Sequence, residues 1–320
     1  MNLLVTGGAG FIGANFISYM VNLHPDYRIV CLDALTYAAN TDNLPSDSSL
    51  FRFVRGDIRD REAVFNLFAE ESFDAVINFA AESHVDRSIE DPGVFISTNI
   101  SGTQVLLDAC RQFGSIRFHQ VSTDEVYGDL PLCSEEVFTE ESSLRPSSPY
   151  SASKAAADLL VLSYNRTYGL PVTISRSSNN YGPFQHSEKL IPLMIKKALR
   201  GENLPIYGNG ENKRDWLYVS DHCKALDMIL HSGKKGEIYN IGSGTERSNL
   251  QTVRELLTIM GKDEKLISFV KDRPGHDLRY SISTAKIVSE LGWSPGTDFY
   301  DGLKATAEWY TKQYETREMK

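Results

Sequence analysis

The segment MNLLVTGGAGFIGANFISYM (residues 1–20) decides the fold class of this 320-residue chain. An apolar run at 3–5 predicts a strand, Gly7, Gly10 and Gly13 follow it, and a helical pattern comes next. Glycines at this spacing let the backbone turn tightly, approach a pyrophosphate and pack the helix against a sheet. The segment therefore predicts the first strand and helix of a dinucleotide-binding domain.

A second predicted strand, 28–32, ends in Asp33, which lies 20 residues after Gly13. An acid at that distance can bind both hydroxyls of an adenosine ribose, and its charge repels a 2′-phosphate. We therefore expect NAD rather than NADP as the cofactor. The alternative is that Asp33 only caps a loop.

Further predicted strands at 51–54 and 75–79 alternate with helical stretches, and each ends in small or polar residues. This alternation is typical of an α/β protein with a doubly wound parallel sheet, which binds ligands at the carboxyl ends of its strands. We expect a Rossmann-like NAD domain over 1–185, with 217–245 packing back onto it, and a smaller C-terminal α/β substrate lobe over 186–320. The expected cofactor-binding residues near the strand ends are Gly7, Gly10, Phe11, Ile12, Gly13, Asp33, Asp57, Ile58, Ala80 and Ala81, and Tyr150 and Lys154 complete the set.

The composition predicts a cytoplasmic protein without a membrane segment. A net charge of −9 argues against a nucleic-acid partner, and the apolar runs are too short to cross a bilayer. The N-terminus lacks the basic region of a signal peptide. Four cysteines without CxxC spacing and seven histidines without an HxxxH pair predict buried free thiols and no metal site.

Two further motifs carry groups suited to catalysis. In YSASK, Tyr150 and Lys154 share one face of a predicted helix, so the ammonium can stabilise the phenolate and lower its pKa. In VSTDEVYG (121–128), an apolar strand ends in hydroxyl residues and then in Asp124 and Glu125. Neighbouring residues of a strand point to opposite faces, so both acids can face one ligand only if the strand ends near Thr123. The alternative for this pair is a solvated turn.

Taken together, seven motifs give the chain a family resemblance. TGGAGFIG, NFAAESHVDRS, VSTDEVYG, YSASK, SNNYGP, RDWLYVSDH and DRPGHDLRY span nearly the whole sequence. With them the chain resembles the nucleotide-sugar 4,6-dehydratases, a family of extended short-chain dehydrogenases/reductases, above all those that act on dTDP-glucose. The resemblance implies an NAD-dependent hydro-lyase of deoxysugar biosynthesis. VSTDEVYG separates this group from the epimerases, which are expected to lack the acid pair.

The resemblance also implies a role for each catalytic candidate. The sugar is oxidised at carbon 4, loses water across carbons 5 and 6, and is reduced at carbon 6. Tyr150, supported by Lys154, takes the proton of the 4-hydroxyl, and Thr123 hydrogen-bonds the 4-oxygen. Glu125 then removes the proton at carbon 5, and Asp124 protonates the departing 6-hydroxyl. Asp124 must be protonated for this step, so we expect burial or its like-charged neighbour to raise its pKa.

A nucleotide sugar carries a diphosphate, which arginine binds well through two parallel hydrogen bonds. The resemblance places Arg214 and Arg273 at the phosphates, and Tyr207 and Asn249 at the base or ribose. The chain departs from the family at Ser177, a nearly isosteric replacement of cysteine, and at Ser187, which replaces proline. Loss of the proline loosens a segment that borders the nucleotide and leaves the base and sugar preference open. The expected substrate-binding residues are Ser83, Asn179, Lys189, Tyr207, Arg214, Asn249, Arg273 and His276.

The helix that begins at Tyr150 carries four consecutive apolar residues at 159–162, and an all-round apolar helix is buried. In relatives this helix and the one over 99–113 form a homodimer, although a buried monomer interior also explains the pattern. Asn99 is interpreted as a structural residue at a helix start. The alternative functions are the same dehydration of UDP-N-acetylglucosamine, a nucleotide-sugar epimerase or decarboxylase, and a non-catalytic NAD-binding protein.

Overall fold

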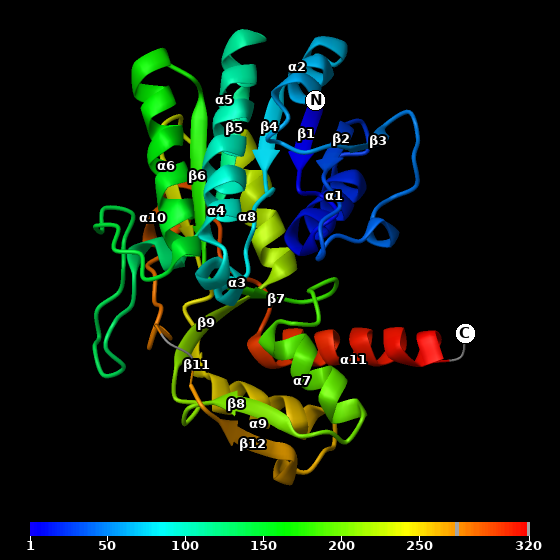
Figure 1. The fold of residues 1–320 in the computed structure, drawn as a ribbon, viewed down its shortest axis with the longest axis vertical. Coiled ribbons are helices and arrows are strands. Elements are labelled where there is room, and N and C mark those ends of the chain that lie inside the picture. Colours follow the sequence, from blue (N-terminus) through cyan, green and yellow to red (C-terminus); the bar gives the residue numbers. More distant parts are fainter. Residues whose placement is uncertain (273–274, 319–320) are drawn as a thin grey trace.

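The computed structural model describes residues 1–272 and 275–318, and within them seven parallel strands form a central sheet (Figure 1). The strand order is β10-β6-β5-β4-β1-β2-β3, so the chain reverses its direction of progress between β1 and β4. Such a reversal leaves a crevice at the carboxyl ends of the strands. The predicted α/β fold with a doubly wound parallel sheet is confirmed. The strands are β1 (Asn2–Thr6), β2 (Arg28–Asp33), β3 (Phe51–Arg55), β4 (Ala75–Asn78), β5 (Arg117–Thr123), β6 (Val172–Ser177) and β10 (Ile238–Ile241).

Helices cover both faces of this sheet because its strands are apolar on both sides. Leu3 and Val5 of β1 enter one core and Leu4 enters the other, as the alternation of a strand requires. The helices on the first face are α1 (Phe11–Leu23), α8 (Val219–Ser232) and α10 (Ala285–Leu291). Those on the second are α2 (Arg61–Glu70), α5 (Thr103–Gln112) and α6 (Pro149–Tyr168), which lie side by side in Figure 1.

Between β4 and α5 the chain forms α3 (Val85–Glu90), α4 (Pro92–Phe95) and a π-helical turn, η2 (Ile96–Gly102). Asn99 lies inside this π-helix, so the prediction that it starts a helix is wrong. Its buried side chain accepts a hydrogen bond from the Glu82 N–H (2.8 Å) and donates to the Glu82 carbonyl (3.0 Å) and to Ser153 Oγ (2.8 Å). Asn99 therefore fixes the segment after β4 against α6.

The second lobe lies below the large sheet in Figure 1 and contains two small sheets. Its core includes Tyr181, Trp216 and Leu256. One sheet has the order β11-β9-β7 and the other pairs β12 with β8. The strands are β7 (Asn179–Tyr181), β8 (Leu204–Tyr207), β9 (Lys213–Tyr218), β11 (Glu246–Ser248) and β12 (Ile267–Val270). The helices of this lobe are α7 (Leu190–Leu199), α9 (Asn249–Ile259) and α11 (Phe299–Glu318), and the short turn η4 (Glu264–Leu266) precedes β12. Another short turn, η1 (Thr41–Asn43), lies between β2 and β3.

The chain passes between the lobes more than once. After β9, the helix α8 and the strand β10 return to the large sheet. α10 and Trp293 also pack in this core, although they fall in the segment assigned to the substrate lobe. The limits of the two lobes remain a prediction.

All four cysteines lie in the described part of the chain as free thiols. Three of them are buried, but Cys133 is exposed on the loop after β5, so the prediction of buried thiols is wrong for this residue. Among the described residues, no helix combines the length and apolarity needed to cross a membrane.

Candidate active site

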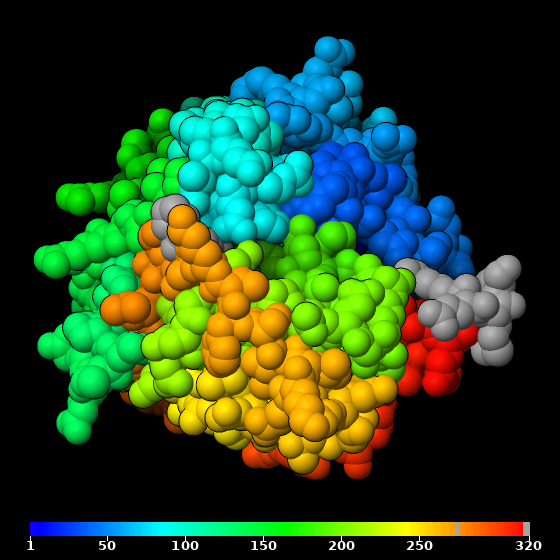
Figure 2. Space-filling view, turned by 60° about the horizontal axis from the view of Figure 1, so that its bottom comes forward, coloured from blue at the N-terminus to red at the C-terminus, as the bar shows by residue number. Residues whose placement is uncertain are grey.

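A cleft opens where the carboxyl ends of the large-sheet strands face the second lobe. Every predicted cofactor-binding residue lines it, as do Thr123, Asp124, Glu125, Ser83, Asn179 and Lys189. Figure 2 shows the cyan segment of α3 and α4 directly beside the green and orange segments of the second lobe. The cleft thus draws its walls from both lobes.

The glycine turn forms the floor at one end of the cleft. Gly7 has a φ of +68°, and a Cβ built there would lie 2.5 Å from the backbone nitrogen of Ala80. A Cβ on Gly13 would lie 2.5 Å from the Gly7 carbonyl oxygen. α1 begins at Phe11 without a side-chain cap on its first N–H groups. This cradle therefore fits a pyrophosphate at a helix N-terminus, the arrangement that NAD requires.

Asp33 organises the loops around it and also lies at the cleft. Its oxygens accept hydrogen bonds from the Ala9 N–H (2.9 Å) and the Leu35 N–H (2.8 Å). The residue lines the cleft, and its contact with a ribose stays a prediction. Burial raises its pKa, and the two backbone donors oppose that rise. Asp57, nearby, forms an ion pair with Arg59 (2.6 Å), which lowers the Asp57 pKa.

The acid pair stands where the sequence predicted a break in the strand. β5 ends at Thr123, and the 3₁₀ turn η3 (Asp124–Tyr127) follows at once. Asp124 is buried, and burial raises its pKa well above the usual value; Glu125 and Asp215 add to the rise and Arg214 opposes it. This is the direction expected for a proton donor. No sequence pattern indicated Asp215, although it follows Arg214 in the motif RDWLYVSDH.

Tyr150 and Lys154 lie one helical turn apart near the start of α6. Lys154 Nζ donates a hydrogen bond to the Val121 carbonyl oxygen (2.7 Å), and burial lowers the Lys154 pKa to about 8. The pKa of Tyr150 is raised, first by burial and then by Glu125. The prediction of a lowered Tyr150 pKa is therefore wrong for this structure, because burial and the nearby carboxylates raise that pKa.

Several residues that line the cleft carry a buried side-chain oxygen without a hydrogen-bond partner among the described residues, including Asp124 Oδ2, Asn179 Oδ1 and Gln185 Oε1. Buried polar atoms are normally satisfied, so unpaired atoms in the wall of a cleft are unusual. A side-chain rotation that turns such an atom toward the cleft would let a hydroxyl group of a ligand become its partner.

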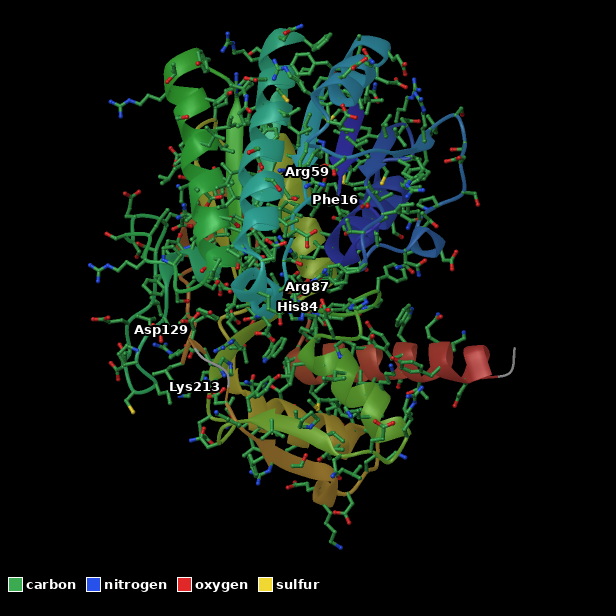
Figure 3. All side chains as sticks on the ribbon, viewed as in Figure 1. Phe16, Arg59, His84, Arg87, Asp129 and Lys213 are labelled. Atoms are coloured by element: carbon green, nitrogen blue, oxygen red, sulfur yellow. The ribbon has the colours of Figure 1, made fainter. Side chains whose placement is uncertain are left out.

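At the mouth of the cleft, Glu188 joins the two lobes. It accepts a hydrogen bond from Tyr37 Oη (3.2 Å) and lies 3.5 Å from His84 Nε2. His84 and Arg87 of the α3 segment are labelled in Figure 3 just above the second lobe. Lys189 Nζ donates to the Ser83 carbonyl oxygen (3.4 Å). These contacts hold the segment in which Ser187 replaces proline. No sequence pattern indicated Tyr37 or Glu188, although Glu188 directly follows Ser187.

Four other expected substrate-binding residues lie in the second lobe and do not line this cleft: Tyr207, Arg214, Asn249 and His276. Arg214 is buried; its guanidinium donates to the Asp277 carbonyl oxygen (2.9 Å) and stacks over the Tyr280 ring (4.5 Å). Tyr207 ends β8 with its ring edge-on to His276, and Asn249 begins α9. Arg273 lies outside the described residues. The structure therefore brings Ser83, Asn179 and Lys189 to the wall of the catalytic cleft, while Arg214 lies behind the wall and acts on Asp124 through its charge.

Fold and site together define a class: an extended short-chain dehydrogenase/reductase with an added acid pair. The chain matches the model of the GDP-mannose 4,6 dehydratase family over residues 4–306, and it belongs to this family. It is 54% identical to the low-salt glycan biosynthesis protein Agl12 of Haloferax volcanii (97% of this chain, 98% of the relative). It is 49% identical to the dTDP-glucose 4,6-dehydratase of Haemophilus influenzae, with 97% and 98% covered. The structure is also similar to the crystal structure of DesIV, a dTDP-glucose 4,6-dehydratase from Streptomyces venezuelae with NAD and TYD bound. The TM-score is 0.94 and the sequence identity is 48%, with 99% of this chain and 98% of that chain covered.

Proposed function

We propose that this protein is an NAD-dependent hydro-lyase that converts dTDP-glucose into dTDP-4-keto-6-deoxyglucose. The observation that carries the proposal is the buried acid Asp124 next to Glu125, facing the same cleft as Tyr150 and the glycine cradle. An epimerase or a decarboxylase does not need that pair, and a mere NAD-binding protein does not need Tyr150 and Lys154. Relatives about half identical over their full length bear the name of this dehydratase.

Tyr150 and Lys154 carry out the proton transfer of the first step, the oxidation at carbon 4. When bound in the cleft, NAD supplies the oxidising and reducing power of the reaction. Tyr150 accepts the proton of the 4-hydroxyl, and Thr123 at the end of β5 hydrogen-bonds the 4-oxygen. Lys154 holds a positive charge beside the phenol; it is oriented by the Val121 carbonyl oxygen. Because the Tyr150 pKa is raised by burial and by Glu125, this ammonium is needed to make the phenol a base.

The elimination falls to the acid pair. A ketone at carbon 4 makes the hydrogen at carbon 5 acidic, and Glu125 removes it. Asp124 gives its proton to the leaving 6-hydroxyl, a task that fits its raised pKa. The two side chains can divide these roles because η3 turns the backbone directly after Thr123.

The nucleotide extends from the catalytic cleft toward the second lobe. Ser83, Asn179 and Lys189 are proposed to contact the sugar end, where they line the cleft. Tyr207, Arg214, Asn249 and His276 are proposed to bind the diphosphate and base. Arg214 requires a change of partners to do so, because its donors face backbone carbonyl oxygens.

We also propose a homodimer that pairs α5 and α6 with their counterparts, and a cytoplasmic location. Leu159 of α6 is 58% exposed and Ile96 of η2 is 55% exposed, which supports a partner on this side. Burial in the monomer does not account for Leu159. The free thiols support a reducing compartment.

Product analysis tests the function. The purified protein is incubated with NAD and either dTDP-glucose or UDP-N-acetylglucosamine, and the products are examined by mass spectrometry and NMR. Loss of one water from dTDP-glucose with a ketone at carbon 4 supports the proposal. Water loss from the acetamido sugar alone keeps the chemistry and replaces the substrate, while epimerisation without water loss contradicts it.

A further inference from the structure

A buried ion pair lies behind the catalytic residues. Arg176 Nε of β6 donates a hydrogen bond to Asp158 Oδ2 of α6 at 2.9 Å, and the two side chains are 2% and 0% exposed. Neither residue lines the cleft. Desolvating two charges offsets most of their attraction, so stability alone is a weak reason for such a pair.

Asp158 acts on the lysine of the catalytic helix. It follows Lys154 by one helical turn, on the same face of α6. Burial lowers the Lys154 pKa, and the negative charge of Asp158 opposes that lowering. Burial also raises the pKa of Asp158 itself, and Arg176 opposes this rise. Arg176 thus favours the ionised form of Asp158, and Asp158 favours the protonated form of Lys154.

Arg176 also reaches the turn that carries the acid pair. Its Nη1 donates to Tyr127 Oη at 3.0 Å, and the guanidinium lies 4.8 Å from the centre of the Tyr127 ring. Tyr127 Oη in turn donates to Asn240 Oδ1 at 2.8 Å. Tyr127 is buried and is the last residue of η3, which begins at Asp124. One guanidinium therefore connects the catalytic helix with the acid-bearing turn.

We propose that Asp158 and Arg176 are a positioning pair for the dehydration: Asp158 maintains the charge on Lys154, and Arg176 holds Asp124 and Glu125 in register with Tyr150 through Tyr127. This role rests on the proposed function. The pair touches neither substrate nor cofactor and acts through the residues that do. Among the described residues, Asp158 acts electrostatically on Lys154, and Arg176 acts on Asp158. Glu125, Asp124 and Asp158 act on Tyr150.

Separate variants test the effect of Asp158 on Lys154 and the effect of Arg176 on the placement of Asp124 and Glu125. In Asp158→Asn, Lys154 loses its compensating charge, so the alkaline limb of the kcat/KM profile should move to lower pH by about one unit. Arg176→Met and Tyr127→Phe should instead slow water loss relative to NADH formation, by on the order of tenfold to a hundredfold, because the acid pair is misplaced. Arg176→Lys should recover part of that loss. The readouts are the pH profile, NADH absorbance in a single turnover, and solvent exchange at carbon 5.

His119→Gln is the matched control. His119 is equally buried on β5 and hydrogen-bonds Thr173 and Ser175 of β6, on the opposite face of the sheet from Arg176. The His119→Gln variant should change the free energy of unfolding. It should not shift the alkaline limb of the kcat/KM profile or the ratio of the rates of NADH formation and water loss. Tyr127→Phe keeps the ion pair intact, so it remains informative if Arg176→Met does not fold.

Two results together would overturn the positioning role and leave the proposed function intact. The first is a kcat/KM profile of Asp158→Asn whose alkaline limb matches that of the wild type. The second is wild-type rates of NADH formation and water loss in Tyr127→Phe and Arg176→Lys. Equal effects in His119→Gln overturn the positioning role too, because they would mark a general response to core damage. A wild type that dehydrates no nucleotide sugar overturns the proposed function, and this role with it.

Discussion

Lys154 on α6 donates its hydrogen bond to the main-chain carbonyl of Val121 on β5, 2.7 Å away and only three residues before Asp124. The contact anchors the catalytic helix to the strand whose end carries the acid pair. A side chain that binds main chain in this way is insensitive to the identity of the residue at 121. Together with the contact between Arg176 and Tyr127, this hydrogen bond helps to set the placement of Tyr150 relative to Asp124 and Glu125.

Replacing Glu125 by glutamine should abolish dehydration while NAD still binds. The amide has nearly the same shape but cannot accept the proton from carbon 5, and loss of a general base costs about 10²- to 10⁴-fold in rate. The measurement is solvent exchange at carbon 5 together with NAD affinity. Glu141→Gln, on an exposed loop, is the control. Unchanged turnover in the Glu125 variant rules out its assignment as the base.

Asp124→Asn should impair the elimination more than the oxidation that precedes it. The amide cannot deliver a proton to the leaving hydroxyl, whereas Tyr150 and Lys154 are untouched. NADH should therefore accumulate during a single turnover, and its absorbance measures the effect. Equal slowing of both steps would assign Asp124 to binding instead.

The same variant should be more stable than the wild type at alkaline pH. The folded-state pKa of Asp124 is raised, so its contribution to stability is full below the unfolded-state pKa and is lost as pH rises through the folded-state value. The amide that replaces the carboxyl does not titrate, so the variant should gain on the order of 1 kcal/mol in free energy of unfolding at pH 8. The gain should vanish near pH 4. Urea denaturation at both pH values, with Asp26→Asn as an exposed control, checks the sign; a gain that is independent of pH contradicts the burial argument.

Asp33→Asn should weaken NAD binding by about tenfold to a hundredfold, the cost of losing charged hydrogen bonds to a ribose. It should also reduce discrimination against NADP, because the repulsion of a 2′-phosphate disappears. The amide oxygen can still accept from one of the two loop N–H groups, so the fold should persist. Calorimetric titration with both cofactors is the measurement. If NAD affinity stays the same, Asp33 only caps the loop.

The sequence predicted the local parts of this molecule well. The glycine turn, the strand end at Thr123 and the helix with Tyr150 and Lys154 each depend on neighbours a few residues apart, and short-range rules describe them. Other features depend on which distant segments cover a residue. They are the π-helical position of Asn99, the exposure of Cys133 and the raised pKa of Tyr150. The pairing of Asp158 with Arg176 and Tyr127 joins three elements in space, and no pattern of spacing indicates it.

The most direct measurement follows a label through the reaction. dTDP-glucose carrying deuterium at carbon 4 is incubated with the protein and NAD, and the product is examined by NMR and mass spectrometry. The account predicts loss of one water, a ketone at carbon 4, the deuterium at carbon 6, one solvent hydrogen at carbon 5 and no net NADH. A product that keeps its water, or that returns the deuterium to carbon 4, would contradict dehydration by Asp124 and Glu125.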